Sequence, residues 1–261
     1  MQVPIYQVDA FASERFKGNP AAVMVMDAYP DDELLRCLAA ENNLPETAFL
    51  VTDGAGYRLR WFTPTVEVPL CGHATLASAA VVMERLEPGR TAVTFQSPSG
   101  PLTVRRSAGG YVMDFPPRRC NSIPIPTGLA EALGVMPVEV AHDGVNFLAR
   151  VDREQKVRDL APDLASIARM DVAGVIVTAK GEGDHDFVSR YFAPAIGVPE
   201  DPVTGSAHCA LTPFWSERLQ KEALHAYQAS PRGGELTVRR VGERVELEGS
   251  CVFYLEGLAQ C

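Results

Sequence analysis

The sequence predicts an α+β protein of two similar halves. Each half is expected to be a strongly curved, mostly antiparallel, barrel-like sheet around a central buried helix, with the active site in a cleft between the halves. The first supporting observation is an internal repeat: residues 60–77 read RWFTPTVEVPLCGHATLA, and residues 190–210 read RYFAPAIGVPEDPVTGSAHCA. The second is that each copy continues through a glycine into an apolar segment. A helix that is apolar on all sides must be buried on all sides, so strands have to surround it.

The repeat is long enough to predict a duplication. Arg60 and Arg190 lie 130 positions apart, and Gly72-His73-Ala74 matches Gly205-Ser206-Ala207 at an offset of 133. The motif Ser-Pro-x-Gly occurs at 97–100 and again at 230–233, and LTVRR follows it in both places. Matches in one order and at nearly one offset indicate that the two halves share one structural plan.

Apolar runs and turn residues predict the elements of the first half. A helix starts near Pro30, because the acidic residues after it favour the positive end of a helix dipole. Pro45-Glu46 stands at the head of an apolar strand, and the central helix is expected over 72–86. The other strands of this half are expected at 5–11, 21–26, 57–62, 92–95, 102–105 and 111–115.

A proline-rich stretch at 116–126 is the expected connector. It divides the chain into a first half at 1–117 and a second half at 118–261, whose last strand could pair back into the first half. In the second half one helix follows Pro162, and another starts at Ser206 and is expected to kink at Pro213. Strands are expected at 138–140, 146–151, 174–178, 187–192, 235–239, 244–248 and 251–255.

Composition and charge narrow the class of protein. The net charge of −9 and pI near 5.1 argue against nucleic acid or an anionic membrane as partner. No apolar run approaches the roughly 20 residues of a membrane span, and the first residues lack the pattern of a signal peptide. The six cysteines show no regular spacing, so free thiols in the cytoplasm are expected.

The two glycine turns are the predicted ligand site. Unpaired N–H groups and the positive dipole at a helix N-terminus bind anions, and Gly72 and Gly205 allow close approach of a ligand to the backbone. Two such turns could hold one small anionic metabolite through its carboxylate. The residues expected to bind substrate are Gly72, Ala74, Thr204, Gly205 and Ala207. The simpler alternative is that both glycines only begin helices.

Four side chains are candidates for the chemistry. Glu46 occurs in one half only, which suits a single general acid and base whose pKa partial burial would raise. His73 lies in the first turn of a helix, where the dipole favours a neutral imidazole. Asp201 could position a polar group of the ligand or cap a helix, and Ser206 could line the site or serve as an N-cap.

Other chemistries find less support in the sequence. A racemase with two thiols would need a partner for Cys71, but the repeat places Thr204 there, and a threonine hydroxyl without a base beside it does not abstract a proton. No G-x-S-x-G elbow supports a hydrolase. The five histidines form no HxH or HxxxH pair, so no metal site is expected. No nucleotide-binding motif occurs, and no cofactor is expected.

Four motifs together resemble the PhzF family, the phenazine-biosynthesis-type isomerases. They are VDAF…GNPAAV at 8–23, NNLPETAFL at 42–50, LCGHATLAS at 70–78 and EDPVTGSAHCAL at 200–211. The resemblance implies a diaminopimelate epimerase-like fold, Glu46 as the acid and base, and a site lined by His73, Asp201 and Ser206. It also implies isomerisation of a dihydro-hydroxyanthranilate-like compound, and a homodimer.

The leading hypothesis is a cytoplasmic, cofactor-independent isomerase. In it, Glu46 removes a proton from carbon and returns it elsewhere on a carboxylate-bearing substrate. The competing hypothesis is a small-anion-binding or regulatory protein that keeps the same site without turnover. An amino-acid epimerase or racemase is a third possibility, which Thr204 disfavours.

Overall fold

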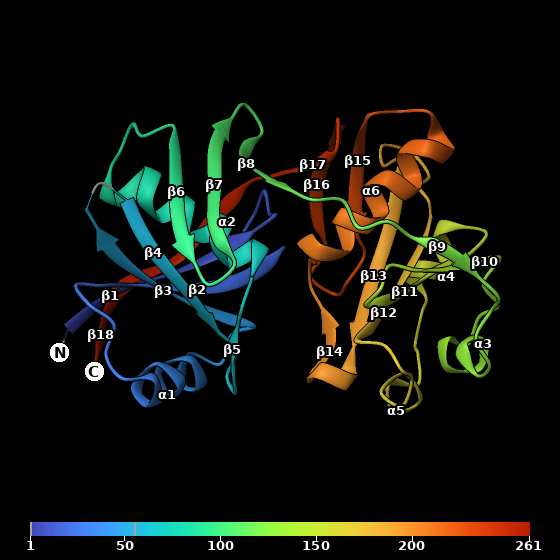
Figure 1. Ribbon diagram of the computed structural model, residues 1–261, viewed down its shortest axis with the longest axis horizontal. Helices are drawn as coiled ribbons and strands as arrows, with labels where there is room; N and C mark the ends of the chain where they lie inside the picture. Colours follow the sequence, from blue (N-terminus) through green and yellow to red (C-terminus); the bar gives the residue numbers. More distant parts are fainter. Residues whose placement is uncertain (1, 55) are drawn as a thin grey trace. The chain divides into compact units, whose positions relative to one another are not determined.

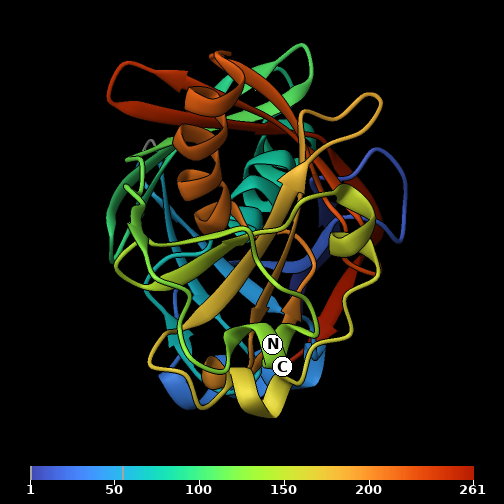
Figure 2. The same ribbon diagram turned by 90° about the vertical axis from the view of Figure 1, so that its right-hand side faces the viewer.

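The chain folds into two compact units, seen in a computed structural model that describes residues 2–54 and 56–261 (Figure 1). Unit 1 comprises the residues up to Asp114 together with Glu248–Cys261, and unit 2 comprises Phe115–Leu247. The sequence placed the boundary after residue 117. The C-terminal residues belong to unit 1 because the last strand pairs along the first one, with Gln260 opposite Gln2. The two chain ends accordingly lie side by side (Figures 1 and 2).

Unit 1 is built on a continuous series of paired strands. The series runs β18–β1–β2–β3–β4–β6–β7–β8, in which β2–β3 and β4–β6 are parallel and the other pairs are antiparallel. A short β5 pairs with β4. The strands are β1 (Gln2–Ala10), β2 (Asn19–Met26), β3 (Glu46–Asp53), β4 (Gly56–Phe62), β5 (Glu67–Val68), β6 (Ala92–Ser97), β7 (Gly100–Ser107), β8 (Gly110–Phe115) and β18 (Cys251–Gln260).

Unit 2 repeats that series. Its pairs run β9–β10–β11–β12–β13–β15–β16, with β11–β12 and β13–β15 parallel at the places where unit 1 has β2–β3 and β4–β6. β14 pairs with β13 as β5 pairs with β4. The strands are β9 (Asn121–Ile123), β10 (Glu139–His142), β11 (Asn146–Arg150), β12 (Gly174–Lys180), β13 (Phe187–Ala193), β14 (Val198–Asp201), β15 (Ala223–Gln228) and β16 (Gly234–Val241). β17 (Arg244–Gly249) begins in unit 2, and its last two residues belong to unit 1.

Two helices of unit 1 lie against the strands. α1 (Asp32–Asn42) is capped by the Asp31 side chain and packs Leu35 against Phe49 and Phe62. α2 (Gly72–Val81) contacts β1, β2, β3, β7 and β18, and every residue after its first glycine is buried. The strands thus cover α2 as its apolar sequence requires. The expected helix over 72–86 ends in a π-helical turn, η1 (Val82–Leu86).

The helices of unit 2 differ more from expectation. α6 (Gly205–Leu219) contacts β15 and β16 and continues through Pro213. The predicted helix after Pro162 is the single turn α5 (Leu164–Ile167). The short helices α3 (Leu129–Leu133) and α4 (Glu154–Arg158), and the 3₁₀ turn η2 (Pro194–Ile196), had no clear signal in the sequence. Among the described residues, no helix is long and apolar enough to cross a membrane.

The burial of α2 predicts a large cost for truncating its core side chain. Leu76→Ala should lower the free energy of unfolding by about 2–5 kcal/mol, because the removed atoms leave a cavity in a fully buried site. Leu258→Ala is the matched control, since that side chain is 59% exposed on β18, and should change stability by less than about 0.5 kcal/mol. Urea unfolding of both variants measures this, and equal small effects would show that α2 does not anchor unit 1.

Candidate active site

Three polar side chains of unit 1 gather at the start of α2. Glu46 is the first residue of β3, Cys71 precedes the helix, and His73 lies in its first turn. Glu46 Oε2 is 3.3 Å from His73 Nε2, and Cys71 Sγ is 3.5 Å from His73 Nδ1. The structure therefore brings two of the predicted catalytic residues, Glu46 and His73, into direct contact.

Burial decides the charge of His73. Its side chain is only 7% exposed, and desolvation lowers its pKa from 6.5 to about 3, although a contact with the Pro20 carbonyl acts weakly in the other direction. The imidazole is therefore neutral near pH 7. Glu46 is 18% exposed, so its carboxylate can be reached from solvent while the histidine beside it stays enclosed.

Among residues 2–54 and 56–261, Glu46, Cys71 and His73 form the group that could hold a metal ion, with candidate ligand atoms within 4.8 Å of one another. Their arrangement is not that of a ready site. The thiol lies at Nδ1 of the ring and the carboxylate at Nε2, so the two flank opposite nitrogens. One ion bound to a single ring nitrogen would need one of them to move.

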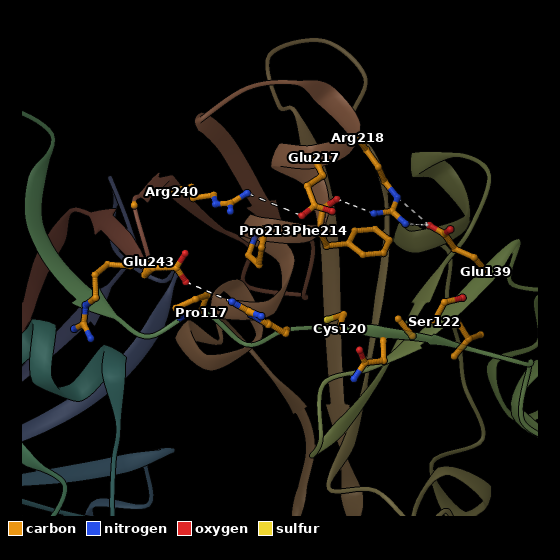
Figure 3. Close-up of a pocket in the computed structure, with 16 residues that line it drawn as sticks. Pro117, Cys120, Ser122, Glu139, Pro213, Phe214, Glu217, Arg218, Arg240 and Glu243 are labelled. Atoms are coloured by element: carbon orange, nitrogen blue, oxygen red, sulfur yellow. Dashed lines mark hydrogen bonds and ion pairs between the residues drawn. The ribbon is translucent and has the colours of Figure 1, made fainter.

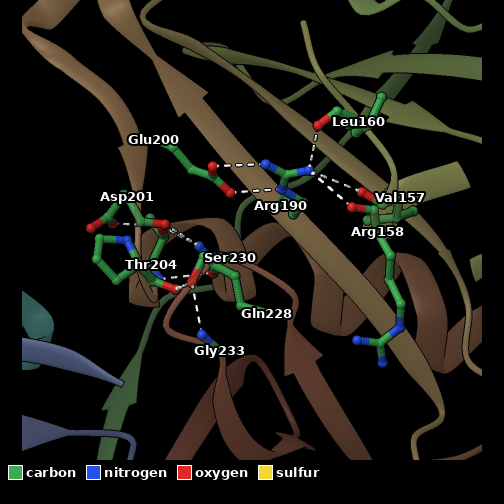
Figure 4. Close-up of polar contacts among 11 residues, drawn as sticks. Val157, Arg158, Leu160, Arg190, Glu200, Asp201, Thr204, Gln228, Ser230 and Gly233 are labelled. Atoms are coloured by element: carbon green, nitrogen blue, oxygen red, sulfur yellow. Dashed lines mark hydrogen bonds and ion pairs between the residues drawn. The ribbon is translucent and has the colours of Figure 1, made fainter. Parts of the chain in front are cut away.

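In unit 2 the corresponding turn is held by a network of side chains (Figure 4). The Thr204 hydroxyl donates to Asp201 Oδ2 at 2.5 Å, and the Thr204 N–H donates to Gln228 Oε1 at 2.9 Å. Gln228 Nε2 in turn donates to the Asp201 carbonyl at 2.7 Å. Asp201 and Thr204 thus share one hydrogen-bonded turn before α6.

Residues of the repeated Ser-Pro-x-Gly motif hydrogen-bond to the glycine turn of their own unit. Ser230 Oγ donates to the Pro202 carbonyl at 2.9 Å and accepts from the Gly233 N–H at 3.1 Å. In unit 1 the matching serine, Ser97, instead donates to the Gly100 carbonyl at 2.7 Å, and Ser99 of the same motif donates to the Pro69 carbonyl at 2.7 Å. Each copy of the motif therefore ties its own unit's glycine turn to the strand that follows the central helix.

The predicted N-cap role of Ser206 is wrong. The N-cap residue of α6 is Thr204, and neither Thr204 nor Cys71 closes its helix with a side-chain hydrogen bond. Ser206 lies inside the first turn and is exposed, while Ala74 and Ala207 are buried. Both helices thus begin without the side-chain acceptor that most helix N-termini have, as an anion site requires.

Gly205 is not demanded by the fold. Its φ is not positive, and an added Cβ would lie 3.5 Å from Leu247 Cδ1, which is an ordinary contact. An alanine would therefore fit the folded chain at this position. The space left by the missing side chain remains for close approach to the backbone.

Arg190 braces the strand pair that leads to Asp201. Its guanidinium is 9% exposed and makes paired hydrogen bonds of 2.7 and 2.8 Å to the Glu200 carboxylate (Figure 4). It also donates to the Leu160 carbonyl at 2.7 Å. The pair joins β13 to β14 and fixes the residue immediately before Asp201.

Gln228 is the site residue that sequence reasoning missed. It is fully buried at the end of β15, and its amide reaches both ends of the Asp201–Thr204 turn. A signal was present in the repeat: aligning Ser97 with Ser230 places Gln228 opposite Phe95. A polar residue at the position of a buried aromatic one indicates a specific partner.

A separate hollow of unit 2 contains none of the predicted site residues (Figure 3). Ion pairs cross it from Arg119 to Glu243 and from Arg218 to Glu139, and Pro117 and Phe214 contribute apolar surface. Cys120 lies beside it, and burial raises the pKa of that thiol to about 12. A thiol of that pKa is protonated near pH 7 and poorly nucleophilic.

The fold is shared with a distantly related epimerase. A hydroxyproline epimerase from Agrobacterium vitis, solved with trans-4-hydroxy-L-proline, matches the chain with a TM-score of 0.64 at 12% identity, over 98% of this chain and 92% of the other. At that identity the likeness shows an epimerase-like fold and nothing more.

Closer relatives give the family. The chain belongs to the PhzC-PhzF family of phenazine biosynthesis-like proteins, whose pattern matches residues 8–257. An uncharacterized isomerase of Pseudomonas aeruginosa is 49% identical over 257 residues, covering 98% of both chains. The crystal structure of a PhzF family protein from Enterococcus faecalis has a TM-score of 0.97 at 44% identity over the full length of both chains. The resemblance seen in the four sequence motifs is thereby confirmed.

Buried neutral histidines predict acid sensitivity of the fold. Burial lowers the pKa of His208 to about 4, so the unfolded chain, with histidine near 6.5, binds the proton more tightly. Stability should therefore fall as the pH drops from 6.5, by about 2 kcal/mol per such histidine at pH 5. His208→Gln should flatten this dependence in urea titrations, whereas His225→Gln, at an exposed position, should not. An unchanged pH profile in His208→Gln would contradict the account.

Proposed function

We propose that the protein is a cofactor-independent isomerase that moves a proton on a small carboxylate-bearing substrate, with Glu46 as general acid and base. Family membership and relatives named as isomerases support the reaction class. The observation that carries the role of Glu46 is its contact with a neutral, buried imidazole at the start of α2. From the family resemblance we expect a cyclic, dihydro-hydroxyanthranilate-like substrate.

The proposed reaction balances without an oxidant or a cofactor. The Glu46 carboxylate takes a proton from carbon, and the electron pair of that bond enters the neighbouring unsaturated system. Glu46 then returns the proton to another carbon of the same system, and a double bond shifts. General acid–base catalysis needs only this one group within about 3 Å of both carbons.

His73 suits a partner that must accompany Glu46 through both protonation states. A neutral imidazole carries one donor and one acceptor nitrogen. Nε2 lies 3.3 Å from Glu46 Oε2 without a hydrogen bond between them in this structure. A small rotation would let Nε2 donate to the ionised carboxylate, or accept from the protonated one after a change of tautomer. A charged imidazolium would instead hold Glu46 as a carboxylate and oppose its protonation, so the lowered pKa of His73 favours the proposed role.

Substrate binding is proposed for the first turns of α2 and α6 and for the Asp201–Thr204 turn. The backbone N–H groups after Gly72 and Gly205 would hold the anionic group, and the exposed Ser206 hydroxyl would reach a polar substituent. The predicted cleft between the halves stays a prediction, as does the homodimer, which light scattering would test.

A second candidate function is binding of a small anion without turnover, because the helix starts would hold an anion with or without a reaction. A thiol racemase has less support. The Thr204 hydroxyl already donates its proton to Asp201, and burial raises the pKa of the nearby Cys209 thiol to about 12. Neither group is a base near pH 7.

Exchange of carbon-bound hydrogen separates turnover from binding. We expect wild type in D₂O to incorporate deuterium into at least one compound from a panel of cyclic and amino-acid carboxylates, followed by NMR. Glu46→Gln should lower the rate at least about 100-fold, as loss of a general base does. Glu33→Gln, exposed on α1, is the matched control and should exchange like wild type. Exchange that survives Glu46→Gln would disprove the role of Glu46.

Gly205→Ala tests the proposed anion site without disturbing the fold. Because a Cβ meets only an ordinary contact there, the free energy of unfolding should stay within about 1 kcal/mol of wild type. Binding of anthranilate, an aromatic carboxylate that cannot isomerise, should weaken about tenfold or more in calorimetric titrations. Gly257→Ala, with open space around its Cα, is the control for both measurements. Undiminished anthranilate binding by Gly205→Ala would exclude this helix start as the anion site.

A further inference from the structure

We propose that Gln228 is a positioning residue that presents the Asp201–Thr204 turn to the ligand, so that it governs substrate affinity without touching substrate. The proposal rests on the proposed function for the identity of the ligand. Its structural basis is the buried network of unit 2, in which one amide side chain contacts the backbone and side chain of the turn at three points (Figure 4).

The orientation of the Gln228 amide is determined by its backbone partners. The Thr204 N–H is a donor, so the atom that it meets at 2.9 Å must be the amide oxygen. The Asp201 carbonyl is an acceptor, so the atom 2.7 Å from it must be the amide nitrogen. If the amide were flipped, its NH₂ group would face the Thr204 N–H, and its oxygen would face the Asp201 carbonyl. Gln228 therefore has a single allowed orientation, and it clamps residues 201 and 204 together.

The same orientation sets the direction of the side-chain hydrogen bonds. The Gln228 amide nitrogen can only donate, so at 3.2 Å the Thr204 hydroxyl oxygen is the acceptor. The single proton of that hydroxyl is then directed to Asp201 Oδ2 at 2.5 Å. A hydrogen-bond chain thus runs from Gln228 through Thr204 to Asp201. It fixes the position of the Asp201 carboxylate oxygen that accepts from Thr204.

Gln228 acts through its neighbours, because its side chain is fully buried and beyond the reach of a ligand. Because the Thr204 N–H donates to Gln228, it is not available to a ligand. The N–H groups that follow it in the first turn of α6 would therefore bind the anion. The first copy of the repeat has Phe95 at the aligned position, which cannot make these bonds. The clamp therefore belongs to the second glycine turn alone.

An isosteric substitution tests the proposal. Gln228→Met keeps the volume of the side chain and removes all three hydrogen bonds, and Gln228→Glu keeps only the acceptor for the Thr204 N–H. We expect the Kd for anthranilate to rise about tenfold or more in both variants. For any compound that wild type turns over, KM should rise by a similar factor, with kcat within about twofold, because Glu46 and His73 in unit 1 are unaltered.

Thr178→Val provides the matched control. Thr178 is also fully buried in unit 2, and it donates to the Val188 carbonyl and accepts from the Trp215 indole, away from the turn. Its loss should lower stability without changing the Kd for anthranilate. A merely structural role for Gln228 would give the same result as Thr178→Val: less folded protein by circular dichroism, a lower apparent kcat, and unchanged KM and Kd.

The Thr204 amide gives a readout that is independent of ligand. In ¹⁵N NMR spectra, its hydrogen exchange should accelerate at least about tenfold in Gln228→Met and much less in Gln228→Glu. Unchanged exchange together with unchanged anthranilate affinity would overturn the proposal, and so would a wild type that binds no carboxylate. If wild type binds anthranilate but exchanges no carbon-bound hydrogen, the proposed isomerase function fails while the role of Gln228 is still decided by the Kd values.

Discussion

The structure depends on the burial of a mostly apolar helix that has no exposed face. The residues of α2 from His73 to Val81 are all buried, and the hydroxyls of Thr75 and Ser78 donate to carbonyls of the preceding turn. A helix enclosed in this way is accessible to a ligand mainly at an end. At the N-terminal end lie the unpaired N–H groups and the positive end of the helix dipole, so the proposed anion site is placed at the end of the helix that this packing encloses. α6 begins in the same way in unit 2.

The two units use one backbone plan with different side chains. The strand pairings correspond one to one from β1–β2 and β10–β11 to β6–β7 and β15–β16. At the glycine turns the side chains diverge. Unit 1 has Glu46 and a neutral His73 there. In unit 2 the Thr204 hydroxyl donates to Asp201, and the buried Gln228 amide hydrogen-bonds to both residues. In the proposed function, unit 1 carries the proton chemistry, and the turn of unit 2 contributes to binding of the ligand.

Much of this plan could be predicted from the sequence because duplication leaves a direct record in it. The repeat around Arg60 and Arg190 corresponds to β4 and β13, and the glycines mark the starts of α2 and α6. Glu46 was chosen as a candidate because the second half has no matching acid at the aligned position. The helix dipole predicted a neutral His73, and the structure adds desolvation by burial as the cause and the contact that joins the two residues.

The remainder depends on contacts between residues far apart in the chain. Gln228 lies 24 positions from Thr204, and no local pattern in β15 shows that its amide returns to that turn. Single-turn helices such as α3 and α4 are set by packing against the sheet, and their five residues are too few for a clear period. The last strand, β18, pairs with β1 and so belongs to unit 1. This pairing joins the two ends of the chain, and no local sequence pattern indicates it.

In the proposed reaction, Glu46 alone removes and returns the proton, and the second half has no equivalent residue. This claim is tested most directly by following a label within the substrate. A compound that the enzyme isomerises would carry deuterium at the carbon that loses its hydrogen, and a single turnover in H₂O would be analysed by mass spectrometry. Transfer by Glu46 alone predicts that part of the deuterium appears at the new carbon of the product. Complete loss of deuterium to water in the first turnover would contradict the return of the same proton by Glu46.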